Sequence, residues 1–121
     1  MKNIKIAIHD EVLLGHLKSV LTGKGYSVVN YDSFDRLADE DYSETELVIL
    51  DPFMAPPGEA TGLIDTLKSR SATSRIPILL CSHEDNDQLI ISCMNAGASD
   101  FIMLPSSRKT LKARIQNLLQ H

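Results

Sequence analysis

The chain has 121 residues, enough for one folded domain and too few for a second core of useful size. Its 43% hydrophobic and 23% charged residues are those of an ordinary globular protein and argue against a disordered chain. A net charge of −4 argues against a general binder of nucleic acids or anionic membranes, because such proteins need basic surfaces. We therefore expect a single domain over residues 1–121.

Targeting signals and cysteine chemistry are also predictable. We expect no signal peptide, since the amino terminus lacks a long apolar run, and no segment approaches the ~18 apolar residues of a membrane span. Cys81 falls in a predicted strand and Cys93 on the apolar side of a predicted helix, so both are expected to be buried thiols. These features predict a cytoplasmic protein without a membrane partner.

Short apolar runs alternate with helical patterns along the whole chain. The alternation predicts a flavodoxin-like, doubly wound, parallel five-stranded sheet with helices on both faces. The expected strands are residues 4–8, 26–30, 47–50, 76–81 and 101–104. The first expected helix runs from Val12 to the glycines at 23 and 25, and the second from a cap at Ser33 to about Glu40. The third and fourth cover residues 62–70 and 85–95. The last begins after a cap at Ser106 or Ser107.

Residues 47–50 are apolar throughout, as in a central parallel strand that is covered on both faces. They lead into Asp51, and residues 51–61 hold three prolines and a glycine, which predicts a loop. In parallel α/β sheets the chemistry lies at the carboxyl ends of the strands. The residues to examine are those that follow the strands: His9, Asp10, Asp51, Ser82, His83, Leu104 and Pro105.

Asp10 and Asp51 follow the first and third expected strands, which would be neighbours in such a sheet. Two carboxylates that converge there would form an oxygen-ligand site suited to Mg²⁺. The alternative is that each carboxylate caps the turn or helix that follows it. The residues alone leave both interpretations open.

The whole chain resembles the receiver domain of bacterial response regulators. The resemblance rests on four segments in the right order, which are specific together: residues 6–11 (IAIHDE), 47–51 (LVILD), 76–82 (IPILLCS) and 96–101 (AGASDF). It implies a non-enzymatic signalling module of a two-component system, read by a downstream protein at the face of the fourth helix, fifth strand and fifth helix.

The resemblance also implies roles for single residues. Asp51 would be the phosphoacceptor, which takes a phosphoryl group from a histidine kinase or another phosphodonor. Asp10 and the backbone carbonyl of Phe53 would join Asp51 as ligands of Mg²⁺. The Ser82 hydroxyl would bind the phosphoryl group, and Phe101 would be the aromatic residue whose rotamer follows that switch.

One departure from the family pattern concerns Leu104, which precedes Pro105 where the family has a lysine. That lysine pairs with the acceptor carboxylate, and a charge-assisted bond of this kind is worth roughly 1.5–3 kcal/mol. No lysine or arginine lies between Arg75 and Arg108, and Arg108 and Lys109 are expected on a solvent-facing helix.

Other departures lie close to the same site. His9 stands where the family has an acid, and a neutral imidazole is a poor ligand for Mg²⁺. His83 is bulky where the family has a small residue, so it would narrow the access of the phosphodonor. Pro52 follows the acceptor immediately and Gly62 comes three residues later than the family glycine, so this loop would reshape or cover the pocket.

Several functions therefore remain in view. The leading hypothesis is an atypical receiver with weakened or lost phospho-switching, and the alternative is a phosphorylation-independent interaction module. A transition-metal site built from His9, His83, Asp10 and Asp51 is a further alternative. A small-molecule binder on a flavodoxin-like fold is another, although no glycine-rich phosphate loop follows the first strand. We expect no DNA binding by this chain, which shows no helix-turn-helix motif.

The fourth expected helix carries a wider apolar stripe than one core-facing side requires. The stripe is either packing alone or a surface for a partner or a homodimer. Its members are Leu89, Ile90, Ile91, Cys93 and Met94.

Overall fold

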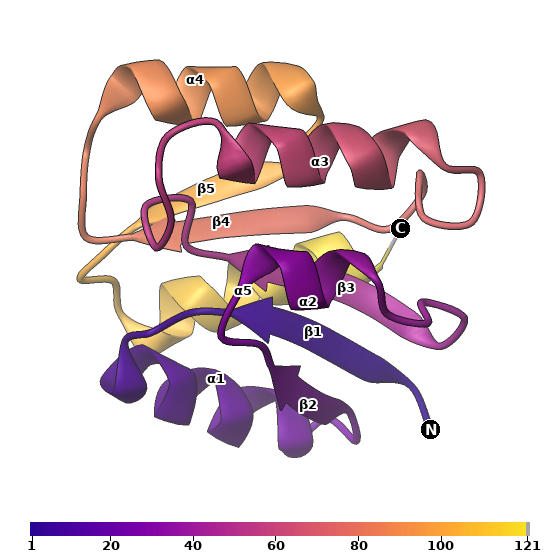
Figure 1. Ribbon diagram of the computed structural model, residues 1–121. Helices are drawn as coiled ribbons and strands as arrows, with labels where there is room; N and C mark the ends of the chain where they lie inside the picture. Colours follow the sequence, from indigo (N-terminus) through magenta and orange to yellow (C-terminus); the bar gives the residue numbers. More distant parts are fainter. Residues whose placement is uncertain (121) are drawn as a thin grey trace.

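Strands and helices alternate five times in the computed structural model, which describes residues 1–120 (Figure 1). The five strands are parallel, in the order β2-β1-β3-β4-β5, and this confirms the predicted fold. The strands are β1 (Asn3–Ala7), β2 (Ser27–Asn30), β3 (Thr45–Leu50), β4 (Ile78–Ser82) and β5 (Asp100–Met103). The helices are α1 (Glu11–Thr22), α2 (Phe34–Ala38), α3 (Glu59–Ser69), α4 (Asp87–Ala96) and α5 (Arg108–Leu119).

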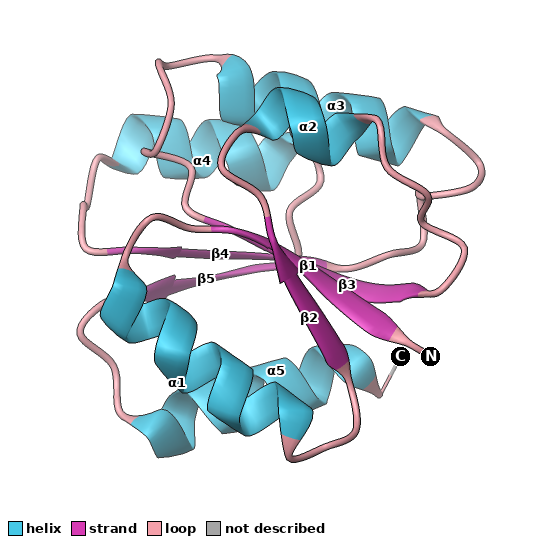
Figure 2. Cartoon of the chain, turned by 60° about the horizontal axis from the view of Figure 1, so that its bottom comes forward, coloured by secondary structure: helices cyan, strands magenta, loops and turns pink. Residues whose placement is uncertain are grey.

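The sheet is the middle of three layers. Figure 2 shows α1 and α5 on one face of the sheet and α2, α3 and α4 on the other. Side chains of β3 alternate between the two cores, with Leu47 and Ile49 toward α1 and α5, and Val48 and Leu50 toward the opposite layer. All four are fully buried, and burial of each such side chain stabilises the fold by roughly 1.5–3 kcal/mol.

The two thiols are buried on opposite sides of the sheet. Cys81 belongs to the core under α1 and α5, and Cys93 to the core under α2, α3 and α4. Both are free cysteines, as predicted. Burial raises the pKa of the Cys81 thiol to about 12. Within residues 1–120, no helix has the length and apolar character needed to span a membrane.

Helix α3 begins earlier than the sequence pattern predicts. It starts at Glu59 instead of Gly62, because Gly58 adopts a left-handed φ of 97° and turns the chain into the helix directly after the prolines. Gly62 therefore lies inside α3. The predicted start of this helix at residue 62 is therefore wrong.

The structure identifies predicted serines as the N-caps of α2 and α5. Ser33 caps α2, where its Oγ accepts from the Arg36 N–H at 3.3 Å. Of the two candidates for α5, Ser107 is the cap, and its Oγ accepts from the Thr110 N–H at 3.0 Å. Each cap satisfies one of the N–H groups that a helix start leaves without an intrahelical partner.

Candidate functional site

Asp51 lies at the centre of the carboxyl edge of the sheet. Its backbone N–H donates to the Ala7 carbonyl oxygen at 3.0 Å and extends the β1–β3 ladder by one residue. The chain then turns sharply, and the Phe53 N–H donates to Asp51 Oδ1 at 2.9 Å. The half-buried carboxylate is thus oriented by the turn that follows its own strand.

Asp10 follows β1 and is the N-cap of α1. Its Oδ1 accepts from the N–H groups of Val12 and Leu13, each at 3.0 Å, and its Oδ2 lies 2.8 Å from His83 Nε2. The Leu13 N–H, followed by His83, holds the pKa of the Asp10 carboxyl below its usual value. The capping interpretation is therefore correct for Asp10, and the same carboxylate also lies at the strand ends.

Ser82 is the last residue of β4 and is only 1% exposed. Its Oγ accepts from the Glu84 N–H at 3.1 Å, which leaves the hydroxyl proton available to a further acceptor. Phe101 is half-buried on neighbouring β5, where it pairs with Leu80 and packs against the core under α2, α3 and α4. The sheet thus brings the predicted switch residues onto adjacent strands.

Leu104 follows β5, and its side chain is part of the core under α1 and α5. It is 8% exposed. Arg108, one of the two candidates for a substitute cation, donates to Ser19 Oγ at 3.1 Å, in the third turn of α1. At this strand end a leucine therefore contributes packing and no charge.

The two histidines near the strand ends have different partners. His9 Nε2 lies 3.3 Å from the Asp32 carbonyl oxygen, in the segment between β2 and α2, whereas His83 contacts Asp10. In the part of the chain that the structure describes, no three His, Cys, Asp or Glu side chains form a group that could hold a metal ion. The alternative of a transition-metal site built from His9, His83, Asp10 and Asp51 is therefore wrong, although His83 and Asp10 do lie in contact.

A magnesium ion requires a different donor set. Asp10, Asp51 and the Phe53 carbonyl offer only oxygen atoms, which are the ligands that Mg²⁺ prefers, and one or two carboxylates with water and phosphate usually suffice. The chemistry of these donors fits magnesium. His9 adds nothing to the set, since its ring is engaged with the Asp32 carbonyl.

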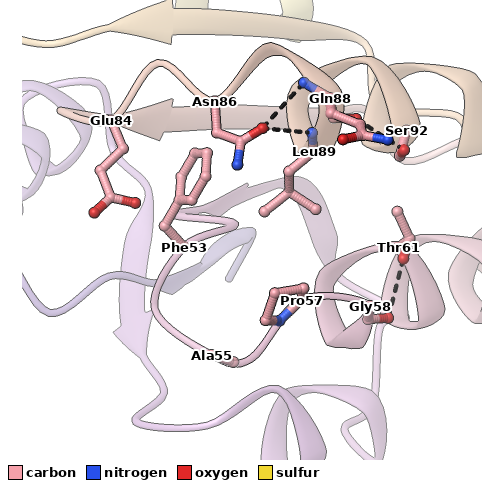
Figure 3. Close-up of a pocket in the computed structure, with 10 residues that line it drawn as sticks. All are labelled: Phe53, Ala55, Pro57, Gly58, Thr61, Glu84, Asn86, Gln88, Leu89 and Ser92. Carbon is pink, nitrogen blue, oxygen red and sulfur yellow. Dashed lines mark hydrogen bonds between the residues drawn. The ribbon is translucent and has the colours of Figure 1, made fainter.

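A cleft of about 620 Å³ lies between the loop after Asp51 and the start of α4 (Figure 3). The Phe53 ring points into it, toward the residues that begin α4. No sequence pattern predicts this cleft, because the cleft depends on how the loop packs against α4. Its lining residues are Phe53, Ala55, Pro57, Gly58, Thr61, Glu84, Asn86, Gln88, Leu89 and Ser92.

Comparisons with known proteins point to one family. The family model described as the response regulator receiver domain matches residues 5–116. Two-component response regulator ORR1 of Oryza sativa subsp. japonica is 30% identical over 107 residues, which are 84% of this chain and 46% of that protein. Phosphate regulon transcriptional regulatory protein PhoB of Escherichia coli (strain K12) is 28% identical over 102 residues, 84% of this chain and 44% of PhoB. The chain spans less than half the length of these curated relatives.

Solved structures share the fold at lower sequence identity. The non-phosphorylated HemR receiver domain from Leptospira biflexa has a TM-score of 0.81 at 21% identity, and the match covers 100% of this chain and 96% of that one. The receiver domain of sensor histidine kinase PA1611 from Pseudomonas aeruginosa PAO1 has a TM-score of 0.77 at 17% identity, with full coverage of both chains. That structure carries a magnesium ion coordinated in its active site cleft. Because the family model covers nearly the whole chain, the chain belongs to the response regulator receiver domain family, which consists of two-component signalling modules and not of enzymes.

Proposed function

We propose that this chain is an atypical receiver domain over residues 1–121, in which Asp51 accepts a phosphoryl group and the phospho-switch is weakened. The observation that carries the proposal is the position of Asp51. It directly follows the central strand β3, and its Oδ1 is held by the Phe53 N–H. Asp10 follows β1 on one side of β3, and Ser82 ends β4 on the other.

The transfer is a single displacement at phosphorus. An Asp51 carboxylate oxygen forms the new P–O bond, while the P–N bond to a phosphohistidine of a kinase, or the bond to the leaving group of another phosphodonor, breaks. The product is an acyl phosphate. Positioning and charge neutralisation therefore matter more than acid–base chemistry.

Asp10, Asp51 and the Phe53 carbonyl would hold Mg²⁺, which would neutralise charge on the phosphoryl oxygens. The donor set of this chain supports that assignment, and so does the magnesium ion in the PA1611 receiver domain. The Ser82 hydroxyl, whose proton is available, would donate to a phosphoryl oxygen. The Phe101 side chain would then rotate toward the interior of the domain.

Leu104 accounts for the weakened switch. A missing charge-assisted bond of roughly 1.5 kcal/mol corresponds to about a ten-fold loss in rate or affinity. Phosphorylation would persist, since the acceptor and the oxygen donors remain. The response of the rest of the domain to the phosphoryl group would be smaller.

A downstream protein or a second copy of the domain would read the state of the site at the face of α4, β5 and α5. Three exposed apolar side chains support this surface: Ile91 and Met94 on α4 and Met103 on β5. By contrast, Cys93 of the predicted apolar stripe is fully buried, so the stripe is part core and part surface. The kinase that would supply the phosphoryl group would be a histidine kinase of a two-component system.

The decisive experiment is intact-mass analysis after incubation with acetyl phosphate and magnesium chloride. We expect one added phosphate on the wild type and on the control Asp65→Asn, whose carboxylate is exposed on α3, and none on Asp51→Asn. If the wild type gains no mass at long times, the phosphoacceptor role is wrong. The buried Leu104 would then favour the phosphorylation-independent interaction module.

A further inference from the structure

The contact between His83 and Asp10 joins parts of the chain that are 73 residues apart in sequence. An ionised carboxylate only accepts hydrogen bonds, so His83 Nε2 carries the proton that is donated to Asp10 Oδ2. The two side chains are 55% and 30% exposed, respectively. The pair thus lies at the rim of the site, where His83 has room to move.

The hydrogen bonds on Asp10 leave it little capacity for another ligand. Oδ1 accepts two backbone N–H groups, which use both of its lone-pair sites. A metal ion would therefore bind at Oδ2, the oxygen that faces the His83 imidazole at 2.8 Å. Mg²⁺ needs close, nearly octahedral oxygen ligands, so an N–H donor on the same oxygen competes with the ion.

Free space beside the pair can accommodate the His83 side chain after it leaves Asp10. A cavity of about 330 Å³ adjoins the pair, between the start of α1 and the segment that follows β5. Its lining includes Asp10, His16, His83, Leu104 and Arg108. Since a leucine stands at the end of β5, no lysine side chain at that position occupies this space or pairs with the acids.

We propose that His83 is an internal competitor of magnesium: its imidazole holds Asp10 Oδ2 in the metal-free domain and must leave before the ion binds. The proposal rests on the proposed function, since it assigns Asp10 to the metal. It raises the magnesium concentration at which the domain becomes competent for phosphorylation, because the ion must first displace His83. The effect is a moderate one of about five-fold in affinity, as expected for a partly exposed pair.

The test is a titration of ¹⁵N-labelled protein with magnesium chloride, followed by the amide shifts of Asp51 and Phe53. We expect His83→Ala to bind the ion about five-fold more tightly than the wild type, and His83→Gln, which keeps an N–H donor, to lie between them. The matched control is His16→Ala, which removes another imidazole from the same cavity and should bind like the wild type. Asp10→Asn should weaken binding in the wild type and in the His83→Ala background.

Equal or weaker binding by His83→Ala would overturn the proposal, as would a gain of the same size in His16→Ala. Because these titrations use the metal alone, they are independent of phosphoryl transfer. Equal affinities together with a phosphorylated Asp51 would overturn this inference and leave the proposed function intact. Five-fold tighter binding by His83→Ala without phosphorylation of Asp51 would overturn the proposed function and leave this inference intact.

Discussion

The ends of β3 and β5 differ in chemistry although the same sheet positions both. Each strand pairs with β4, which lies between them. β3 leads into Asp51, a half-buried carboxylate that is oriented by a backbone N–H. β5 leads into Leu104, whose side chain is part of the core. The sheet thus fixes where a strand end lies, while the residue found there decides whether that place serves chemistry or stability.

Removal of the Leu104 side chain tests whether the end of β5 contributes to the stability of the core. We expect Leu104→Ala to lower the free energy of unfolding by about 2–3 kcal/mol, because it leaves a cavity in the core under α1 and α5. The neighbouring Met103 is 40% exposed, so Met103→Ala should cost less than about 1 kcal/mol. Urea unfolding of the two variants measures the difference. Equal losses would mean that the end of β5 is not part of the core.

Placing a cation at the end of β5 tests whether its absence limits the phosphorylation of Asp51. Leu104→Lys should raise the rate of phosphorylation by acetyl phosphate at least about ten-fold, the value of a charge-assisted bond of roughly 1.5 kcal/mol. Leu104→Met keeps the apolar character and should leave the rate unchanged. A time course by intact mass gives both rates. If the lysine variant folds and reacts no faster, the absence of the cation does not limit this site.

The end of β1 adds a third case, in which one carboxylate serves both stability and chemistry. Asp10→Ala should cost about 1 kcal/mol at neutral pH, because it removes the N-cap of α1. The pKa of Asp10 is lowered in the folded state, so its stabilisation is present above the ordinary value of 3.8 and is lost as the pH falls below it. The difference between wild type and variant should therefore shrink in acid.

Urea unfolding at several pH values measures this trend, with Asp65→Ala as a control on the exposed side of α3. The control should show no comparable loss, since alanine favours the helix interior. A difference that is constant down to strongly acidic pH would show that the Asp10 charge does not contribute to the cap.

The sequence predicted most of the fold because its apolar runs and helical patterns are local features. The position of Asp51 followed from the same patterns, since chemistry in parallel sheets lies at the strand ends. The start of α3 was missed because it depends on the left-handed conformation of Gly58, which no periodicity indicates. His83 and Asp10 were expected near one another only in the alternative of a transition-metal site. Their direct contact depends on the tertiary fold, which brings the N-cap of α1 beside the residue that follows β4.

Spectroscopy of the phosphorylated domain tests the central claim, an acceptor site with a weakened link to the output surface. ¹H–¹⁵N spectra of the wild type before and after acetyl phosphate treatment should show shift changes around Asp51, Phe53 and Ser82, and small ones at Ile91 and Met103. In the Leu104→Lys variant the changes should extend along α4, β5 and α5. Changes of that full extent in the wild type would contradict the account, because they would show a working switch without the lysine.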